Sequence, residues 1–456
     1  MSKNISLMGG LLASLMVSAQ VTAMPYQSLS PRILSMGGVG VASGDETAAA
    51  LINPALLASS REVEGFNVVL PVLGRRFSDP DGLLDKVDSY QAARLEADLT
   101  DAVDVYDELG ARSVKIIDTT EKVLEVKAAA QSIADISQQI LDQLQKITGK
   151  PVMGEFLSAV TIRIPNKRLS ASLFMDSRVV AGGVFDFGDQ VLLQEIIDAA
   201  NTSANAVDQD QLDALEKNPT IAGQLFLEED VEIINAVENL TSNLSARGAI
   251  VSEIGLVLSR EFVVAGHDVA VGVTPKLVKV QTFDYILGID RANFDSDLGQ
   301  REYTDFNLDV GLAKGFGNGW QMGLAVMNLL GKAYDTRPYS SVSGLTPASA
   351  VIKIDPQVRL GVAHSNEILT LAADLDVTEN DSAGFESKTQ YFGLGAELAL
   401  SDWGQLRAGY RYNLSDSDDD MPSLGFGFSP FGVQMDMAIA GNGDEQAFSF
   451  QLGFRF

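Results

Sequence analysis

The chain has 456 residues, a formal net charge of −28 and no cysteine. The missing cysteines exclude disulfide cross-links and thiolate metal sites. The acidity argues against nucleic acid as a partner, because neutralising phosphates needs clustered Lys and Arg. The length fits either one large closed domain or two ordinary ones.

Residues 1–23 predict an export signal. Lys3 precedes an apolar run over residues 5–17, and the stretch ends in Val21, Thr22 and Ala23, which is typical of a signal peptide cleaved before Met24. The alternative is a buried N-terminal helix. The rest of the sequence has no run of eighteen or more apolar residues, so we expect no membrane helix.

Residues 24–60 are rich in Gly and Ala and contain two short motifs, Met-Gly-Gly-x-Gly from Met36 and Asn-Pro-Ala-Leu from Asn53. The motifs resemble the N-terminal segment of FadL-type outer-membrane transporters and their relatives, the PorV-like secretion barrels and the TraF-like conjugal-transfer family. In those proteins Gly usually stands where this chain has Leu56. The resemblance implies a plug or gate inside a barrel, carried by Gly37, Gly38, Gly40, Asn53, Pro54, Ala55 and Leu56.

From residue 61 to residue 456 the pattern predicts about fourteen strands, an even number as in single-chain bacterial barrels. They cover residues 61–71, 152–165, 168–187, 247–263, 267–290, 303–315, 319–330, 352–364, 367–379, 388–400, 404–414, 421–429, 430–440 and 446–456. The expected fold class is an all-β transmembrane barrel of antiparallel strands, with an N-terminal plug and two α-helical insertions in long loops.

Many of these segments alternate between an apolar and a polar face. In 404–414, Leu406 and Tyr412 lie on one face while Arg407 and Arg411 lie on the other. A membrane barrel needs the apolar face outward and the polar face toward the lumen. The expected lumen residues are Asp305, Asp309, Arg359, Asp374, Asp376, Arg407 and Arg411. They are interpreted as ion pairs that brace the barrel, with catalytic pairs as the alternative.

The last ten residues, 447–456, alternate most clearly, with an aromatic or Leu at every second position. One face of this segment is too apolar for water. Its end resembles the assembly signal of bacterial outer-membrane barrels, which implies that Phe454 and Phe456 are read by the barrel assembly machinery.

Short and long connections alternate along the chain, and two long ones, 72–151 and 188–246, contain apolar residues at helical spacing. Residues 83–147 have 13 acidic against 7 basic side chains, and residues 189–245 have 12 against 1. The insertions are expected outside the cell, as helical hairpins that pack together as a cap, or as a binding platform or lid. One miscounted strand would place an insertion in the periplasm.

The sequence contains two His and shows no Ser-His-Asp set, Cys nucleophile or metal-ligand spacing. We therefore expect no enzyme activity, no catalytic residue, no cofactor and no metal.

Two hypotheses follow for a protein expected in the outer membrane of a Gram-negative bacterium, in contact with lipid and lipopolysaccharide. The first is a plugged passive channel for a hydrophobic or amphipathic ligand, as in FadL-type proteins. The second is a scaffold for conjugal transfer or secretion that contacts a cell-surface protein through its helical insertions, as the TraF-like and PorV-like resemblances imply.

Overall fold

The computed structural model describes residues 21–23, 29–59, 66–113, 120–164, 169–205, 213, 217, 242–264, 266–288, 297–342, 347–380, 385, 388–415 and 420–456. Most of the predicted signal peptide, and residues 218–241 of the second insertion, lie outside these ranges.

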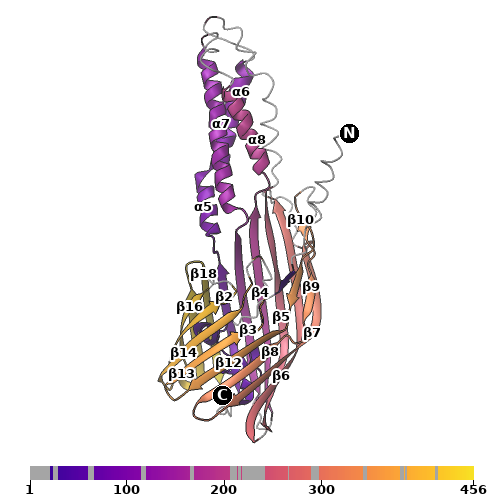
Figure 1. Cartoon of the computed structure of the whole chain (residues 1–456), viewed down its shortest axis with the longest axis vertical. Coiled ribbons are helices and arrows are strands. Elements are labelled where there is room, and N and C mark those ends of the chain that lie inside the picture. Colours follow the sequence, from indigo (N-terminus) through magenta and orange to yellow (C-terminus); the bar gives the residue numbers. More distant parts are fainter. Residues whose placement is uncertain are drawn as a thin grey trace.

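Fourteen strands of the described chain form one closed antiparallel barrel (Figure 1). Each strand pairs with the next, and β18 pairs with β2 to close the ring. The strands are β2 (Asn67–Ser78), β3 (Pro151–Ile164), β4 (Ser170–Asp186), β5 (Asn243–Val264), β6 (His267–Gly288), β7 (Gln300–Gly315), β8 (Trp320–Met327), β12 (Gln357–Ser365), β13 (Leu369–Asp376), β14 (Tyr391–Ser401), β15 (Gly404–Asn413), β16 (Met421–Phe428), β17 (Val433–Gly441) and β18 (Glu445–Arg455). The predicted fold class is confirmed.

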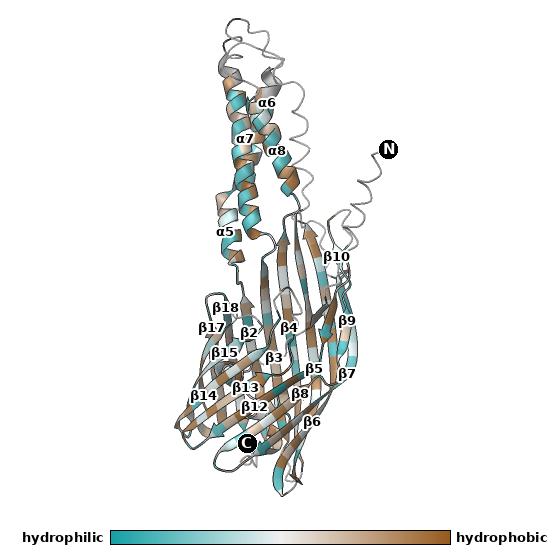
Figure 2. Ribbon diagram, viewed as in Figure 1, coloured by the Kyte–Doolittle hydropathy of each residue, from teal (hydrophilic) through white to brown (hydrophobic). Residues whose placement is uncertain are grey.

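The barrel wall has an apolar outer face and a polar inner face. Leu406 and Tyr412 on β15 are exposed, whereas Arg407 and Arg411 on the same strand are buried. Brown and teal positions accordingly alternate along many strands in Figure 2. Every barrel strand exposes at least one large apolar side chain: Leu70, Phe156, Met175, Ile254, Leu277, Phe306, Met322, Leu360, Leu371, Leu394, Leu406, Phe426, Met437 and Phe448, in strand order around the ring.

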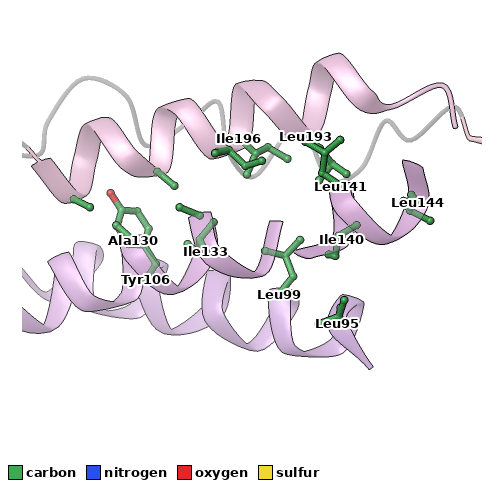
Figure 3. Packing of buried hydrophobic residues seen from close by; sticks show 14 of the residues in the cluster. Leu95, Leu99, Tyr106, Ala130, Ile133, Ile140, Leu141, Leu144, Leu193 and Ile196 are labelled. Atoms are coloured by element: carbon green, nitrogen blue, oxygen red, sulfur yellow. The ribbon is translucent and has the colours of Figure 1, made fainter. Parts of the chain in front are cut away.

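Four helices of the described residues form a bundle beyond one end of the barrel (Figure 1). They are α5 (Leu83–Ala93), α6 (Leu95–Ser113) and α7 (Thr120–Ile147) between β2 and β3, and α8 (Gln190–Asn205) between β4 and β5. Apolar residues at helical spacing, such as Ile133 and Ile140 of α7 and Leu193 and Ile196 of α8, build its core (Figure 3). None of the described helices is both long and apolar enough to cross a membrane.

The bundle lies at the end of the barrel opposite to its first and last strand ends. Phe66 and Phe456 meet there, where each backbone N–H donates to the other's carbonyl at 3.1 and 2.9 Å. An even strand number places both ends of the barrel on one side, and the helical insertions, which follow the first and the third strand, share the other side. The alternative of a miscounted strand is thereby removed.

Two strand predictions were wrong in detail. The first strand runs over 67–78 instead of 61–71, so the helices of the first insertion begin at Leu83. The predicted strand 352–364 is two strands, because Pro356 has no N–H to donate and interrupts the ladder. Its first part, β11 (Val351–Ile354), leaves the wall and pairs with β9 (Lys332–Asp335) and β1 (Val21–Ala23).

As a result, Ile352 and Ile354 do not face lipid. Both are buried and pack with Tyr334 against inward side chains such as Val251 and Val280 of β5 and β6. Nearby, the short strand β10 (Tyr339–Ser340) pairs with β6 in parallel. The connection between β8 and β12 is therefore folded against the inner wall.

Ile133 tests the independence of the bundle from the barrel. Replacing this fully buried side chain by Asp places an unpaired carboxylate in the bundle core and should destabilise the bundle by about 4 kcal/mol or more. The exposed control, Gln145→Asp, should change stability by less than about 0.5 kcal/mol. Limited proteolysis should cut the bundle of Ile133→Asp while the barrel keeps its heat-modifiable migration in SDS gels, and loss of that migration would contradict the prediction.

Candidate functional site

Residues 29–59, here called the lumen segment, lie inside the barrel. They contain the short helices α2 (Pro31–Ser35), α3 (Glu46–Leu51) and α4 (Leu56–Ser59). Helix α2 packs against β15 to β18, α3 against β3 and β4, and α4 against β4 to β7. Four large apolar side chains of the segment, Ile33, Met36, Ile52 and Leu57, are at most 1% exposed. The segment is therefore packed tightly between opposite walls of the barrel.

The wall approaches the lumen segment through inward-facing glycines. A Cβ at any of nine wall glycines would come within 3.0 Å of an atom of residues 29–55. These glycines are Gly74, Gly272, Gly311, Gly323, Gly361, Gly393, Gly395, Gly409 and Gly425, on eight of the fourteen strands. Some stand in register, such as Gly395 with Gly409 and Gly323 with Gly361. We call this set the glycine belt; it lets two backbones come into contact.

The first sequence motif lies against this belt. Gly37 and Gly38 both have positive φ, a conformation that favours glycine. The Gly37 N–H donates to Ser423 Oγ at 3.1 Å, and the Gly40 N–H donates to Asp374 Oδ2 at 2.7 Å. The N–H of Val41 donates to the same carboxylate oxygen at 2.9 Å. One predicted lumen residue therefore holds the predicted glycine motif in place.

The second motif forms a turn beside β6 and β7. Asn53 Nδ2 donates to the carbonyls of Val41 at 2.7 Å and Leu312 at 3.2 Å, while its Oδ1 accepts from the Ala55 N–H at 3.1 Å. Pro54 lies against the glycine belt at Gly311. Asn53 thus ties two parts of the lumen segment to each other and to β7.

Leu56, which stands where FadL-type proteins usually have Gly, is 3% exposed and belongs to the apolar core between the lumen segment and β2 to β8. Its side chain fills space there, so this departure from the family motif has a packing role.

A chain of buried and partly buried charges connects the lumen segment to the wall. Arg32 Nε lies 3.0 Å from Glu397 Oε2 on β14, and the same carboxylate lies 2.6 Å from Arg407 Nε on β15. Arg407 Nη1 also lies 2.6 Å from Asp436 Oδ1 on β17, which accepts through its second oxygen from Gln434 and Gln451. Shared partners satisfy these charges away from water, as buried charges require.

Further inward charges pair between strands inside the barrel. Glu445 Oε1 accepts from Arg411 at 2.9 Å and from Arg76 at 3.2 Å, which links β15, β18 and β2. Arg359 pairs with Asp376 on β13. Through these pairs, the predicted lumen residues Arg359, Asp376 and Arg411 link strands of the barrel wall to one another.

The two remaining predicted lumen residues are on β7. Lys276 on β6 is fully buried between Glu253 at 2.9 Å and Asp309 at 3.1 Å. Asp305 lies nearer the barrel mouth, 3.1 Å from Lys332 of β9. Asp309 therefore braces the wall, whereas Asp305 holds the folded connection.

Little open space remains beside the lumen segment. The cavity bounded by Leu29, Leu34, Gly38, Tyr391 and Met421 measures about 20 Å³, which is room for about one water. Nearer the helical end, β9 and β11 pack against the inner faces of β5 and β6. Within the described residues the lumen is therefore filled in two places along the barrel axis, by the lumen segment and, nearer the helical end, by β9 and β11.

Several lumen residues were not singled out from the sequence. Arg32, Glu397 and Lys276 carry the pairs above, and the glycine belt carries the closest contacts. Inward parity was a signal for part of the belt, because Gly311, Gly361 and Gly409 fall on the polar faces of their strands. Among the described residues, no group of three or more His, Cys, Asp or Glu is placed to hold a metal ion.

Fold and lumen together define a transmembrane β-barrel that is occupied by its own N-terminal segment. The family model described as "F plasmid transfer operon, TraF, protein" matches residues 50–376, and the chain belongs to this family.

Solved barrels of FadL type are similar to this chain in structure. The Ralstonia pickettii toluene transporter TbuX is 12% identical, with a TM-score of 0.47 over 94% of this chain and 99% of that one. A Pseudomonas aeruginosa FadL homologue is also 12% identical, with a TM-score of 0.46 over 96% of this chain and 99% of that one. No curated protein matches the sequence.

The glycine belt can be tested at Gly409. A Cβ there would meet the backbone of Met36 and Gly37, so Gly409→Val should displace the lumen segment or destabilise the barrel by about 1–3 kcal/mol. Trypsin should then cut after Arg32, which is partly buried and paired in the native barrel. The matched control is Gly154→Val on β3, where a Cβ has open space and Arg32 should stay protected. Equal cleavage in both variants would contradict the prediction.

The buried charges should matter more than exposed ones. Arg407→Ala leaves Glu397 and Asp436 with fewer partners and should destabilise the barrel by about 3–5 kcal/mol. Lys279→Ala removes a pair with Glu302 in which both side chains are more than half exposed, and should cost about 0–1 kcal/mol. Urea unfolding in lipid vesicles compares the two, and similar losses would argue against a bracing role.

Proposed function

We propose that this chain is an outer-membrane scaffold of a Gram-negative bacterium, in which a closed barrel anchors a helical bundle that binds a protein partner in conjugal transfer or secretion. The observation that carries the proposal is the filled lumen. Neither transport through an open pore nor catalysis is needed for this role.

The packing of the lumen segment supports a closed barrel. The side chains of Val41, Ile52 and Leu57 are completely buried between the segment and the wall. The Arg32 pair and the hydrogen bonds to Asp374 and Asn53 fix the segment at several places around the ring. A passage for solute would require breaking many of these contacts together.

The helical bundle supports the interaction role. It has its own apolar core, which is built mainly by side chains of the four helices. Its surface is acidic, with Asp98, Asp101 and Asp104 exposed on α6. An acidic surface attracts a basic partner and speeds its association. The family description names a plasmid transfer operon, which agrees with a role in cell-to-cell transfer.

A second candidate is passive uptake of a hydrophobic small molecule. The small cavity beside the lumen segment is bordered by Leu29, Ile33, Leu34 and Met421 and is mostly apolar. The similar solved barrels include toluene transporters. In this candidate the lumen segment moves to enlarge the cavity and admit the ligand.

Replacing residues 189–241 by a short Gly-Ser linker separates the two candidates. A scaffold predicts that donor cells with this variant lose conjugal transfer, while the barrel still inserts and toluene uptake by the cells is unchanged. The control carries the same linker in the short turn at 402–403, at the opposite end of the barrel, and should transfer normally. The opposite outcome is that the variant without residues 189–241 shows normal conjugal transfer and that cells take up toluene only when they contain this chain. These two results together would contradict the scaffold and support the channel.

A further inference from the structure

The barrel wall is much taller on one side than on the other. Strands β4 and β5 have 17 and 22 residues, whereas β12 to β18 have between 8 and 11. Crossing a bilayer takes about 9–11 residues per tilted strand. The tall strands lead directly to the helical bundle (Figure 1).

The outer face of the tall strands stays uncharged along this extra length. Outward positions on β5 alternate with buried inward positions such as Val251 and Val257. Eight of them contain no charge: Leu244, Ala246, Gly248, Ile250, Ser252, Ile254, Leu256 and Leu258. On β4 the register places Met175, Val179, Ala181 and Phe185 beside them.

The polar groups on this strip are paired. Ser177 of β4 and Ser252 of β5 face each other, and their hydroxyls lie 3.0 Å apart in a hydrogen bond. Paired hydroxyls are tolerated in hydrocarbon, where unpaired ones are costly. The strip ends sideways at Lys279 of β6, which is paired with Glu302 of β7 and exposed. At the end of the strip nearest the helical bundle lies Phe185, which packs against the bundle core.

The apolar heights of the two sides differ. The outward residues from Leu244 to Leu258 span about 46 Å along the strand, which at a tilt of about 40° is about 35 Å of height. On β14 the outward residues from Phe392 to Leu400 give about 20 Å of height by the same arithmetic. A typical barrel has an apolar band of about 25 Å.

We propose that lipid covers the outer face of β4 and β5 up to the base of the helical bundle, so that the bilayer is thicker there than beside β12 to β18. The upper part of the strip is continuous with Ile254 and Leu256 lower on β5, which are exposed and belong to the lipid-facing band. Burying the strip in hydrocarbon removes apolar surface from water, and bilayers adjust their thickness to such mismatch at modest cost. The inference rests on membrane insertion of the barrel.

The chain has no cysteine, so single cysteines can report the position of lipid. Ala181→Cys and Ala246→Cys place a thiol on the upper strip with little change in size. Ala396→Cys on the outer face of β14 is the lipid control, and Gln139→Cys on the exposed side of α7 is the water control. Each variant is reconstituted in dimyristoleoyl, dioleoyl or dierucoyl phosphatidylcholine vesicles and labelled with a membrane-impermeant maleimide.

The strip variants should label roughly tenfold or more slower than Gln139→Cys in dioleoyl vesicles, because a thiol in hydrocarbon does not ionise. Their labelling should become faster in the thin dimyristoleoyl bilayer and slower in the thick dierucoyl bilayer, while Ala396→Cys stays protected in all three.

Three results would overturn the inference. If the strip variants label as fast as Gln139→Cys at every bilayer thickness, the strip lies in water. If the same thiols are then protected from labelling only in cell membranes, a protein partner covers the strip in place of lipid. Slow labelling that does not change with thickness would mean that the protein itself shields the thiols. Labelling of Ala396→Cys would show that the barrel is not inserted, a failure that is distinct from the other two.

Discussion

The hydrogen bonds between β18 and β2 are the interaction on which the rest of the structure depends. Hydrocarbon offers no partner to a backbone N–H or C=O, so a sheet that crosses it must have no free edge. The two strands are paired from Glu445 with Ser78 to Arg455 with Asn67. Once the ring is closed, alternate residues must face lipid and lumen, and the period-two pattern along the chain follows from that geometry.

Closure also creates the problem that the lumen contents solve. A ring of fourteen strands is wider than the small barrels whose side chains alone fill the interior. This chain fills the space with its own lumen segment and with the folded connection that contains β9 and β11. Wall glycines allow the backbone of the segment to touch the wall, and inward charges such as Asp374 and Glu397 hold it there.

Local patterns in the sequence were enough to predict the barrel, the number of strands, the helical insertions and the inward position of Arg407 and Arg411. The division at Pro356 was harder, because alternation in 351–354 is the same whether the apolar side meets lipid or a protein core. Partner choice could not be predicted either. Arg32 and Glu397 are 365 residues apart, and nothing local to either residue indicates the other.

The position of the bundle follows from the order of the strands in the closed ring. The insertions follow the first and the third strand of the antiparallel ring, so both emerge at the end opposite to the start of β2 and pack against each other. Helices α7 and α8 belong to different insertions yet share the apolar core that contains Ile133 and Ile196. The barrel thus acts as the support that brings two distant parts of the sequence into one bundle.

The central claim is that the lumen is closed by the chain's own residues. Ionic current through single barrels in a planar lipid bilayer tests this claim most directly. The account predicts no steady conductance for the full chain. A steady current of the size carried by an open porin would contradict it.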